Sequence, residues 1–420
     1  MAQTAFADTL PDDLPDAALS REQSLVRESI VDAQRSVIGY GWAPQLPPAA
    51  NDDPRLFIQL RSVGSHSPIG SRTTFLHCTF EQMADGCLRQ LDPQKTVLAV
   101  PQLARHTPEG IHIRGSMLAY AKASGFRLAF DHSVLRPEYA SWLPMASYVQ
   151  LDMEALGDAE AENLARYVAL QTKAAALARN VSTDAQYERM KNAGAALFEG
   201  LWFAKPPESS QARVLTSQAS VLQLLALVSR DAEVSEIENV LKRDPALSFK
   251  LLRFINSPGF GMTVEITSFR HAVMAMGMNR LLRWAALLLT APRPDGPAPA
   301  AGTMAVVRGR MMELLAADTL SPAQCDTAFV VGVFSMLDTL VGIPLASAMD
   351  MVNLPADAVE AVLHGRGPYA PYLMLARSCE AGAGLTAHGS PDALGYEREH
   401  LNAVHLQSLS WADHFEHGLG

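Results

Sequence analysis

The sequence predicts two folded domains, an α/β barrel followed by an all-helical domain, behind a short acidic segment. Between residues 37 and 203, short apolar runs of strand length recur seven times and alternate with segments of helix length. After Pro207 the pattern changes to amphipathic stretches that begin at helix-capping residues. Strands alternating with helices are typical of a parallel sheet with right-handed crossovers, whereas the later pattern is typical of helices alone.

Length and composition agree with this division. The chain has 420 residues, which corresponds to two to four domains, and 48% of them are hydrophobic, enough for each domain to bury a core. Its net charge is −10, from 34 Lys and Arg against 44 Asp and Glu, so no nucleic-acid partner is expected. The four cysteines form no CxxC pair and predict reduced thiols in a cytoplasmic protein: Cys78, Cys87, Cys325 and Cys379.

Neither the first 22 residues nor the most apolar segment of the chain predicts a secreted or membrane-spanning protein. Residues 1–22 are acidic and lack the cationic start of a signal peptide, so we expect a flexible acidic segment there. Residues 327–349 are nearly all apolar but are interrupted by Asp338, Gly342 and Pro344. Because a charge at mid-span is costly, we expect a buried helix pair and no membrane insertion.

Two proline-rich stretches set the domain boundaries. Residues 204–210 contain Pro206 and Pro207, and residues 291–302 contain four further prolines. Proline resists helix and strand interiors. We therefore expect a barrel domain over residues 23–206, a helical domain over residues 207–420, and an exposed loop at 291–302 within the second domain.

The strands of the first domain are expected at the apolar runs. Seven repeats over about 180 residues favour a small (β/α) barrel, and an open doubly wound sheet is the alternative that periodicity leaves open. Helices are expected between the strands at residues 80–91, 116–124 and 159–171. The runs are 37–40, 75–78, 96–100, 128–130, 148–151, 174–178 and 197–203.

In the second domain, four helix starts can be assigned. Ser235 with Glu238 forms the pattern of a capping box, and Asp244 followed by Pro245 is an N-cap with proline at the first helical position. Ser268 is expected to start a helix that stops at Gly277, and Asn279 to cap the next one.

Several of these segments resemble known families. Residues 27–32 and 37–40 resemble the first strands of an EAL domain, the TIM-barrel-like fold that hydrolyses the bacterial messenger cyclic di-GMP. Residues 198–206, Phe-Glu-Gly-Leu-Trp-Phe-Ala-Lys-Pro, resemble the segment that closes that barrel. Asp244-Pro245-Ala246-Leu247-Ser248 with residues 251–257 resembles an HDOD domain. The chain therefore resembles a two-domain bacterial EAL–HDOD signalling protein.

The resemblance implies metal-binding carboxylates at the strand ends, but this chain departs from the family there. The first-strand glutamate is replaced by Gly41, and later ligand positions carry His77 and Ala99. Only Asp131 and Asp152 remain as carboxylates, too few to hold a divalent ion. We therefore expect no catalytic residue, no bound metal and no cofactor, only a vestigial pocket at the barrel mouth: Asp131, His132, Asp152 and Arg179.

Two other groups of residues are not expected to bind metal. His77, His132 and Asp131 could form a transition-metal site only if their strands were neighbours, and His414 with His417 lacks a third ligand. The HDOD half resembles HD phosphohydrolases, yet the chain contains no His-Asp dipeptide, and the corresponding segment offers Ser335, Met336 and Asp338. The expectation is that the chain is inactive both as a phosphodiesterase and as an HD phosphohydrolase.

The function that follows is a non-catalytic cytoplasmic signalling regulator. It would bind other signalling proteins through the HDOD domain, and a homodimer is among the expected assemblies. Cyclic di-GMP is not expected to bind. The alternative is a non-hydrolysing receptor for cyclic di-GMP or another nucleotide, in which Arg179 pairs with a phosphate and Trp42, if it lies at the mouth, stacks on a base.

Overall fold

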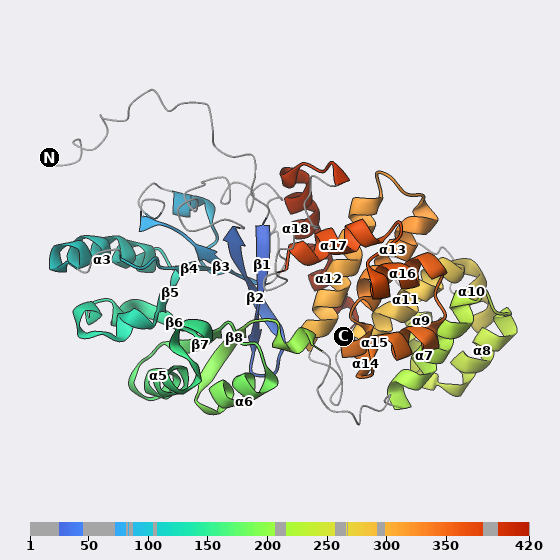
Figure 1. Ribbon diagram of the computed structural model, residues 1–420, viewed down its shortest axis with the longest axis horizontal. Helices are drawn as coiled ribbons and strands as arrows, with labels where there is room; N and C mark the ends of the chain where they lie inside the picture. Colours follow the sequence, from blue (N-terminus) through green and yellow to red (C-terminus); the bar gives the residue numbers. More distant parts are fainter. Residues whose placement is uncertain are drawn as a thin grey trace.

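The protein consists of a closed barrel and a helical domain that lie side by side (Figure 1). A computed structural model describes residues 25–44, 72–80, 83, 87–103, 107–205, 216–256, 266, 268–291, 299–380 and 394–419. The expected acidic segment, residues 1–22, lies outside the described residues. The barrel is confirmed, and the open-sheet alternative is wrong.

The barrel strands follow one another in sequence order around the barrel. Strands β2 to β8 pair in parallel, whereas β1 is antiparallel to both of its neighbours, β2 and β8. The strands are β1 Leu25–Asp32, β2 Val37–Pro44, β3 Thr73–His77, β4 Thr96–Ala99, β5 Arg127–Asp131, β6 Ala146–Asp152, β7 Ala175–Arg179 and β8 Ala195–Glu199.

A β-bulge near the start of β2 decides which side chains enter the barrel. Ile30 pairs with Gly39 and Val31 with Val37, so Ile38 is the extra residue. Beyond the bulge, Gly41 shares the inner face with Glu28. Trp42 therefore faces outward, and it does not lie at the mouth as the nucleotide-stacking hypothesis required.

The helices that follow the barrel strands are α3 Pro108–Ala123, α4 Met153–Leu156, α5 Asp158–Gln171 and α6 Asp184–Asn192. The helix predicted at residues 116–124 begins eight residues earlier than expected. Thr107 caps it, because its side chain accepts the Gly110 N–H at 3.2 Å, and Pro108 occupies the first helical position. The sequence pattern did not indicate this start because the first turn contains Gly110.

The helical domain is built from α7 Thr216–Ser229, α8 Val234–Arg243, α9 Pro245–Ile255, α10 Phe269–Met276, α11 Met278–Thr290, α12 Pro299–Ala316, α13 Pro322–Phe334, α14 Leu337–Val341, α15 Leu345–Val352, α16 Ala356–His364, α17 Ala370–Ser378 and α18 Arg398–Leu419. The Asp244 cap is confirmed, because its carboxylate accepts the Leu247 N–H at 2.9 Å. The Ser268 cap and the stop at Gly277 are confirmed as well.

Three expectations for this domain are wrong. Helix α8 starts at Val234 without a side-chain cap, so Ser235 lies inside the helix. Helix α11 starts directly after Gly277, which places Asn279 in its first turn. The loop expected at residues 291–302 ends earlier, since Pro299–Gly302 form the buried first turn of α12, where proline is tolerated.

Helices α12 and α13 form the centre of the helical domain and pack closely. A Cβ added to Gly332 would lie 2.5 Å from the Gly309 Cα, so both helices need glycine where their backbones approach. The buried apolar side chains of this domain continue without a break into those on the outside of the barrel. A smaller cluster fills the barrel interior: Ile30, Phe75, Val97, Ala129, Leu177 and Leu197.

The helical domain covers the outer face of β1 and β2, on the side where α12 and α18 lie (Figure 1). The Trp42 ring is fully buried there, edge-on to the His405 ring of α18 at 5.8 Å. The Arg27 N–H donates to the Cys379 carbonyl at 2.9 Å, next to α17. A second backbone bond runs from the Ala300 N–H of α12 to the Arg35 carbonyl between β1 and β2, at 3.0 Å, so the two domains share one core and two backbone contacts.

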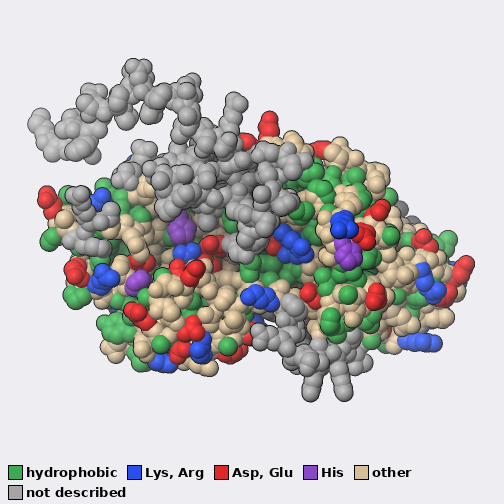
Figure 2. Space-filling view, in the orientation of Figure 1, with side chains coloured by type: hydrophobic (Ala, Val, Ile, Leu, Met, Phe, Trp, Pro, Cys, Tyr) green, Lys and Arg blue, Asp and Glu red, His purple; other side chains and the backbone are tan. Residues whose placement is uncertain are grey.

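The visible face of the molecule carries acidic and basic side chains interspersed (Figure 2). In the described part of the chain, no single helix is long and apolar enough to cross a membrane. Taken together, the bent pair α10 and α11 has the length and composition of a membrane span. The apolar segment 327–349 forms the end of α13, the whole of α14 and the start of α15, which are three helices where a pair was expected.

Candidate functional site

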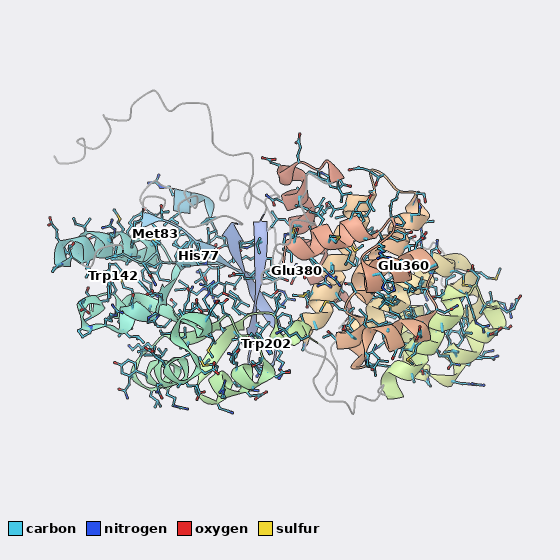
Figure 3. The ribbon with its side chains drawn as sticks, in the orientation of Figure 1. His77, Met83, Trp142, Trp202, Glu360 and Glu380 are labelled. Carbon is cyan, nitrogen blue, oxygen red and sulfur yellow. The ribbon has the colours of Figure 1, made fainter. Side chains whose placement is uncertain are left out.

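The inner side chains at the carboxyl ends of the barrel strands form one polar layer. Side chains alternate along a strand, so each residue two positions beyond an inner core residue also faces inward. His77 follows Phe75 in this way, and Figure 3 places it among the barrel strands. The layer comprises Glu28, Gly41, His77, Ala99, Asp131, Asp152, Arg179 and Glu199.

The centre of this layer is a cluster of three charged side chains from β1, β7 and β8. Arg179 Nε donates to both carboxylate oxygens of Glu199, at 3.0 and 2.9 Å, and its Nη2 donates to Glu28 Oε2 at 3.1 Å. All three side chains are largely buried, with Glu199 only 6% exposed. Two carboxylates therefore share one guanidinium in a place of low polarity.

Burial and charge shift the protonation of these groups. Burial, and then the neighbouring Glu28 carboxylate, raises the pKa of Glu199 to about 8. Burial and the positive charge of Arg179 lower the pKa of His77, so the imidazole is neutral at pH 7. Burial alone would lower the pKa of Arg179, but Glu199 and Glu28 raise it instead.

The two aspartates named from the sequence act mainly as local caps. Asp131 accepts the Ser133 N–H at 3.1 Å and is bonded to the Gln102 amide, and His132 begins the 3-10 helix η3 (His132–Leu135) that Asp131 caps. Asp152 accepts the Glu154 N–H, at 3.0 Å, and the Asn180 side chain, at 2.9 Å.

Of the four predicted pocket residues, the structure brings Asp152 and Arg179 together most directly. They are register partners on β6 and β7, and the Asp152 charge contributes to the raised pKa of Arg179. Asp131 and His132 lie at the end of β5 without a bond to this cluster among the described residues.

Sequence reasoning missed the two glutamates. Glu28 lies opposite Gly41, and a Cβ at position 41 would be 3.3 Å from Glu28 Oε2, so Glu28 fills the space of the missing side chain. Glu199 lies two residues beyond Leu197, which faces inward, and this spacing could have revealed it. The mouth therefore contains four carboxylates, two more than the family's ligand positions indicated.

The residues as arranged do not fit a divalent metal ion. In the part of the chain that the structure describes, no group of three or more His, Cys, Asp or Glu side chains could hold one. Arg179 takes up the oxygens of Glu28 and Glu199, and the aspartates are used as caps. His77, His132 and Asp131 do not form the transition-metal site that was considered, and the side chains of His414 and His417 lie outside the described residues.

A second ionic cluster lies at the boundary between the domains, where Figure 3 labels Glu380. Glu380 accepts two bonds from Arg308, at 3.1 and 2.6 Å, and lies 3.6 Å from Arg27 Nη2. Arg308 also donates to Ser335 Oγ at 2.6 Å, so Ser335 serves this cluster. Asp338 accepts its neighbour's backbone N–H, from Thr339 at 2.7 Å.

Comparison with known proteins identifies the helical half. Residues 215–296 match the family model of the HDOD domain, so the chain carries this domain. Over 400 residues the chain is 23% identical to "Cyclic di-GMP phosphodiesterase CdgJ" of Vibrio cholerae, and the match covers 92% of each protein. It is 24% identical over 360 residues to the uncharacterized protein YuxH of Bacillus subtilis, covering 83% of this chain and 86% of the relative.

The solved structures similar to the chain include an EAL domain protein from Listeria monocytogenes. It is 13% identical with a TM-score of 0.35, covering 44% of this chain and 87% of that one. The chain thus carries an HDOD domain and a closed barrel, and it is similar over nearly its whole length to a named cyclic di-GMP phosphodiesterase. This relation contradicts the expectation that the chain is not an enzyme, and it conflicts with the expectation that cyclic di-GMP does not bind.

Proposed function

We propose that this chain is a bacterial signalling regulator of the cyclic di-GMP system that acts by binding a protein partner through its HDOD domain. The relation to CdgJ supports the messenger, because it extends across 92% of both chains and therefore includes both domains. The shared core of the two domains supports a regulator, because packed side chains that join two domains are the kind of contact that carries coupling between sites.

The observation that carries the proposal is that successive side chains of β1 point to opposite faces of the barrel wall. Glu28 faces the barrel mouth and holds Arg179, whereas Arg27, the next residue, faces the helical domain. Arg27 contacts the end of α17 twice, through its N–H to Cys379 and through its side chain to Glu380. A ligand that displaces Glu28 therefore acts next to Arg27, one of the residues that join the helical domain to the barrel.

Proximity labelling from the full chain in its bacterial host tests the protein partner. We expect the same protein in independent cultures, with less of it recovered by Glu380→Gln, which weakens the domain boundary. Asp158→Asn is the matched control, because its pair with Arg189 lies on an exposed helix surface. Recovery of no reproducible protein would contradict the proposal.

A second candidate function is binding of cyclic di-GMP at the barrel mouth. Arg179 supports it, because its Nε and Nη2 atoms are engaged by carboxylates while Nη1 makes none of the contacts described above. A guanidinium with a remaining N–H edge can donate to a phosphate oxygen.

Calorimetric titration of cyclic di-GMP into the full chain with Mg²⁺ tests this second function, with cyclic di-AMP as the matched ligand. Saturable heat with cyclic di-GMP alone is the expected result, and absence of heat contradicts it. Chromatography of the same sample measures linear product. Product would extend to this chain the activity that CdgJ is named for, and heat without product would make it a receptor.

A further inference from the structure

The carboxylates of the barrel mouth are arranged around a cation, and the cation is part of the chain. Three nitrogen–oxygen contacts of 2.9–3.1 Å join the Arg179 guanidinium to Glu28 and Glu199. These carboxylates come from different strands, β1 and β8, on one side of the barrel. Both strands therefore place their acidic groups at one point, where Arg179 supplies the positive charge.

Two further donor groups surround the same point. The Asp152 carboxylate acts on Arg179 from the neighbouring strand β6, and His77 lies close enough for its imidazole to be influenced by both Arg179 and Glu28. Carboxylate oxygens and a neutral imidazole are the donors that Mn²⁺ and related divalent ions bind. As arranged around the guanidinium these groups do not form a metal site, and the direct contacts of Arg179 are those with Glu28 and Glu199.

Glycine at position 41 makes this arrangement possible. A Cβ there would lie 3.3 Å from both Cβ and Oε2 of Glu28, tighter than most side-chain contacts. With no side chain at position 41, the Glu28 carboxylate can lie over β2 and reach Arg179. The glycine at position 41 and the reach of Glu28 to Arg179 are therefore linked.

We infer that Arg179 is a built-in competitor of divalent metal ions, occupying the cation position between Glu28 and Glu199. While the guanidinium is in place, it takes the carboxylate oxygens and repels a second cation. The cation affinity of the mouth is then set by one residue, and any ligand that draws Arg179 away exposes a metal site. Competition between Arg179 and a metal ion at the barrel mouth requires neither the protein partner nor the nucleotide of the proposed function.

Direct titration of Mn²⁺ into metal-free full-length protein, followed by electron paramagnetic resonance of the free ion, tests the inference. We expect the R179M variant to bind Mn²⁺ at least about tenfold more tightly than the unaltered chain, a change of about 1.4 kcal/mol. Arg179→Lys keeps a cation and should retain the weak binding. R189M is the matched control, because it removes an arginine from the exposed pair with Asp158 and should change nothing.

Two further variants make the result specific. The double variant R179M/E28Q should lose the gain, because one of the two carboxylates is gone. If R179M unfolds without metal, Mn²⁺ at millimolar concentration should restore the folded state by binding it selectively. Unchanged Mn²⁺ affinity in a folded R179M chain, or failure of Mn²⁺ to refold an unfolded one, would overturn the inference. The calorimetric and labelling tests of the proposed function would be unaffected by that outcome.

Discussion

The substitution Glu380→Gln removes the negative charge from the domain boundary while keeping the shape of the side chain. Glu380 is 5% exposed, and its carboxylate is the acceptor for the buried Arg308 and the nearest one to Arg27. Arg27 is 2% exposed, and its Nε and Nη1 atoms have no acceptor in the described part of the chain. Two buried guanidinium groups therefore depend on this one carboxylate.

The expected cost follows from leaving those charges unpaired. Removing one partner of a buried ion pair costs about 3–5 kcal/mol, because the remaining charge stays in a medium of low polarity. The Gln amide still offers one oxygen to Arg308, so we expect a value near the lower end, about 3 kcal/mol.

Urea unfolding of the full chain, followed by circular dichroism, measures this loss as a lower midpoint. Asp158→Asn, which breaks an exposed pair, should change stability by about 1 kcal/mol or less. If Glu380→Gln behaved like this control, the reasoning that the buried cluster holds the two domains together would be refuted.

Three other measurements test particular residues. Because the pKa of Glu199 is raised to about 8 in the folded chain from an ordinary 4.5, the folded state holds more protons between these values. Stability should therefore fall as pH rises through this window and level off above it, and E199Q should remove that part of the dependence in urea titrations at several pH values. Trp42→Ala should cost about 3–5 kcal/mol by the same assay, since a fully buried ring is lost from the domain boundary; a change below about 1 kcal/mol would contradict its packing there. Burial raises the pKa of Cys78 and Cys379 to about 12, so iodoacetamide at neutral pH should label Cys325 before these two in peptide mass mapping, and equal labelling of the three would be contrary to the burial of Cys78 and Cys379.

The fold could be predicted because its signals are local. Seven of the eight barrel strands, β2 to β8, overlap the predicted apolar runs, whereas β1 carries charged residues and is not such a run. Asp244 caps the helix that starts at Pro245 with its own side chain. The starts of α8 and α11 were misplaced because no side chain caps them, whereas the start of α3 was missed although Thr107 caps it. Gly277, for example, precedes α11 with a positive φ of 77° and provides no side-chain oxygen for a pattern to detect.

The candidate site could be predicted only in part, because its key contacts join distant segments. Arg179 was identified, but its partner Glu28 lies 151 residues away on a strand whose antiparallel direction the sequence did not reveal. The bulge at Ile38 shifts the alternation of β2 and turns Trp42 outward. A one-residue shift of this kind reverses the facing of every later side chain, and periodicity alone does not detect it.

We expect the barrel mouth and the helical domain to respond together to cyclic di-GMP. Hydrogen–deuterium exchange of the full chain, with and without saturating cyclic di-GMP and Mg²⁺, measures this most directly. With cyclic di-GMP and Mg²⁺ present, we expect the exchange rates to change both at the barrel strand ends and in α12 and α17. The Arg27 amide should be among the affected groups. Changes confined to the barrel, with α12 and α17 unaltered, would contradict it.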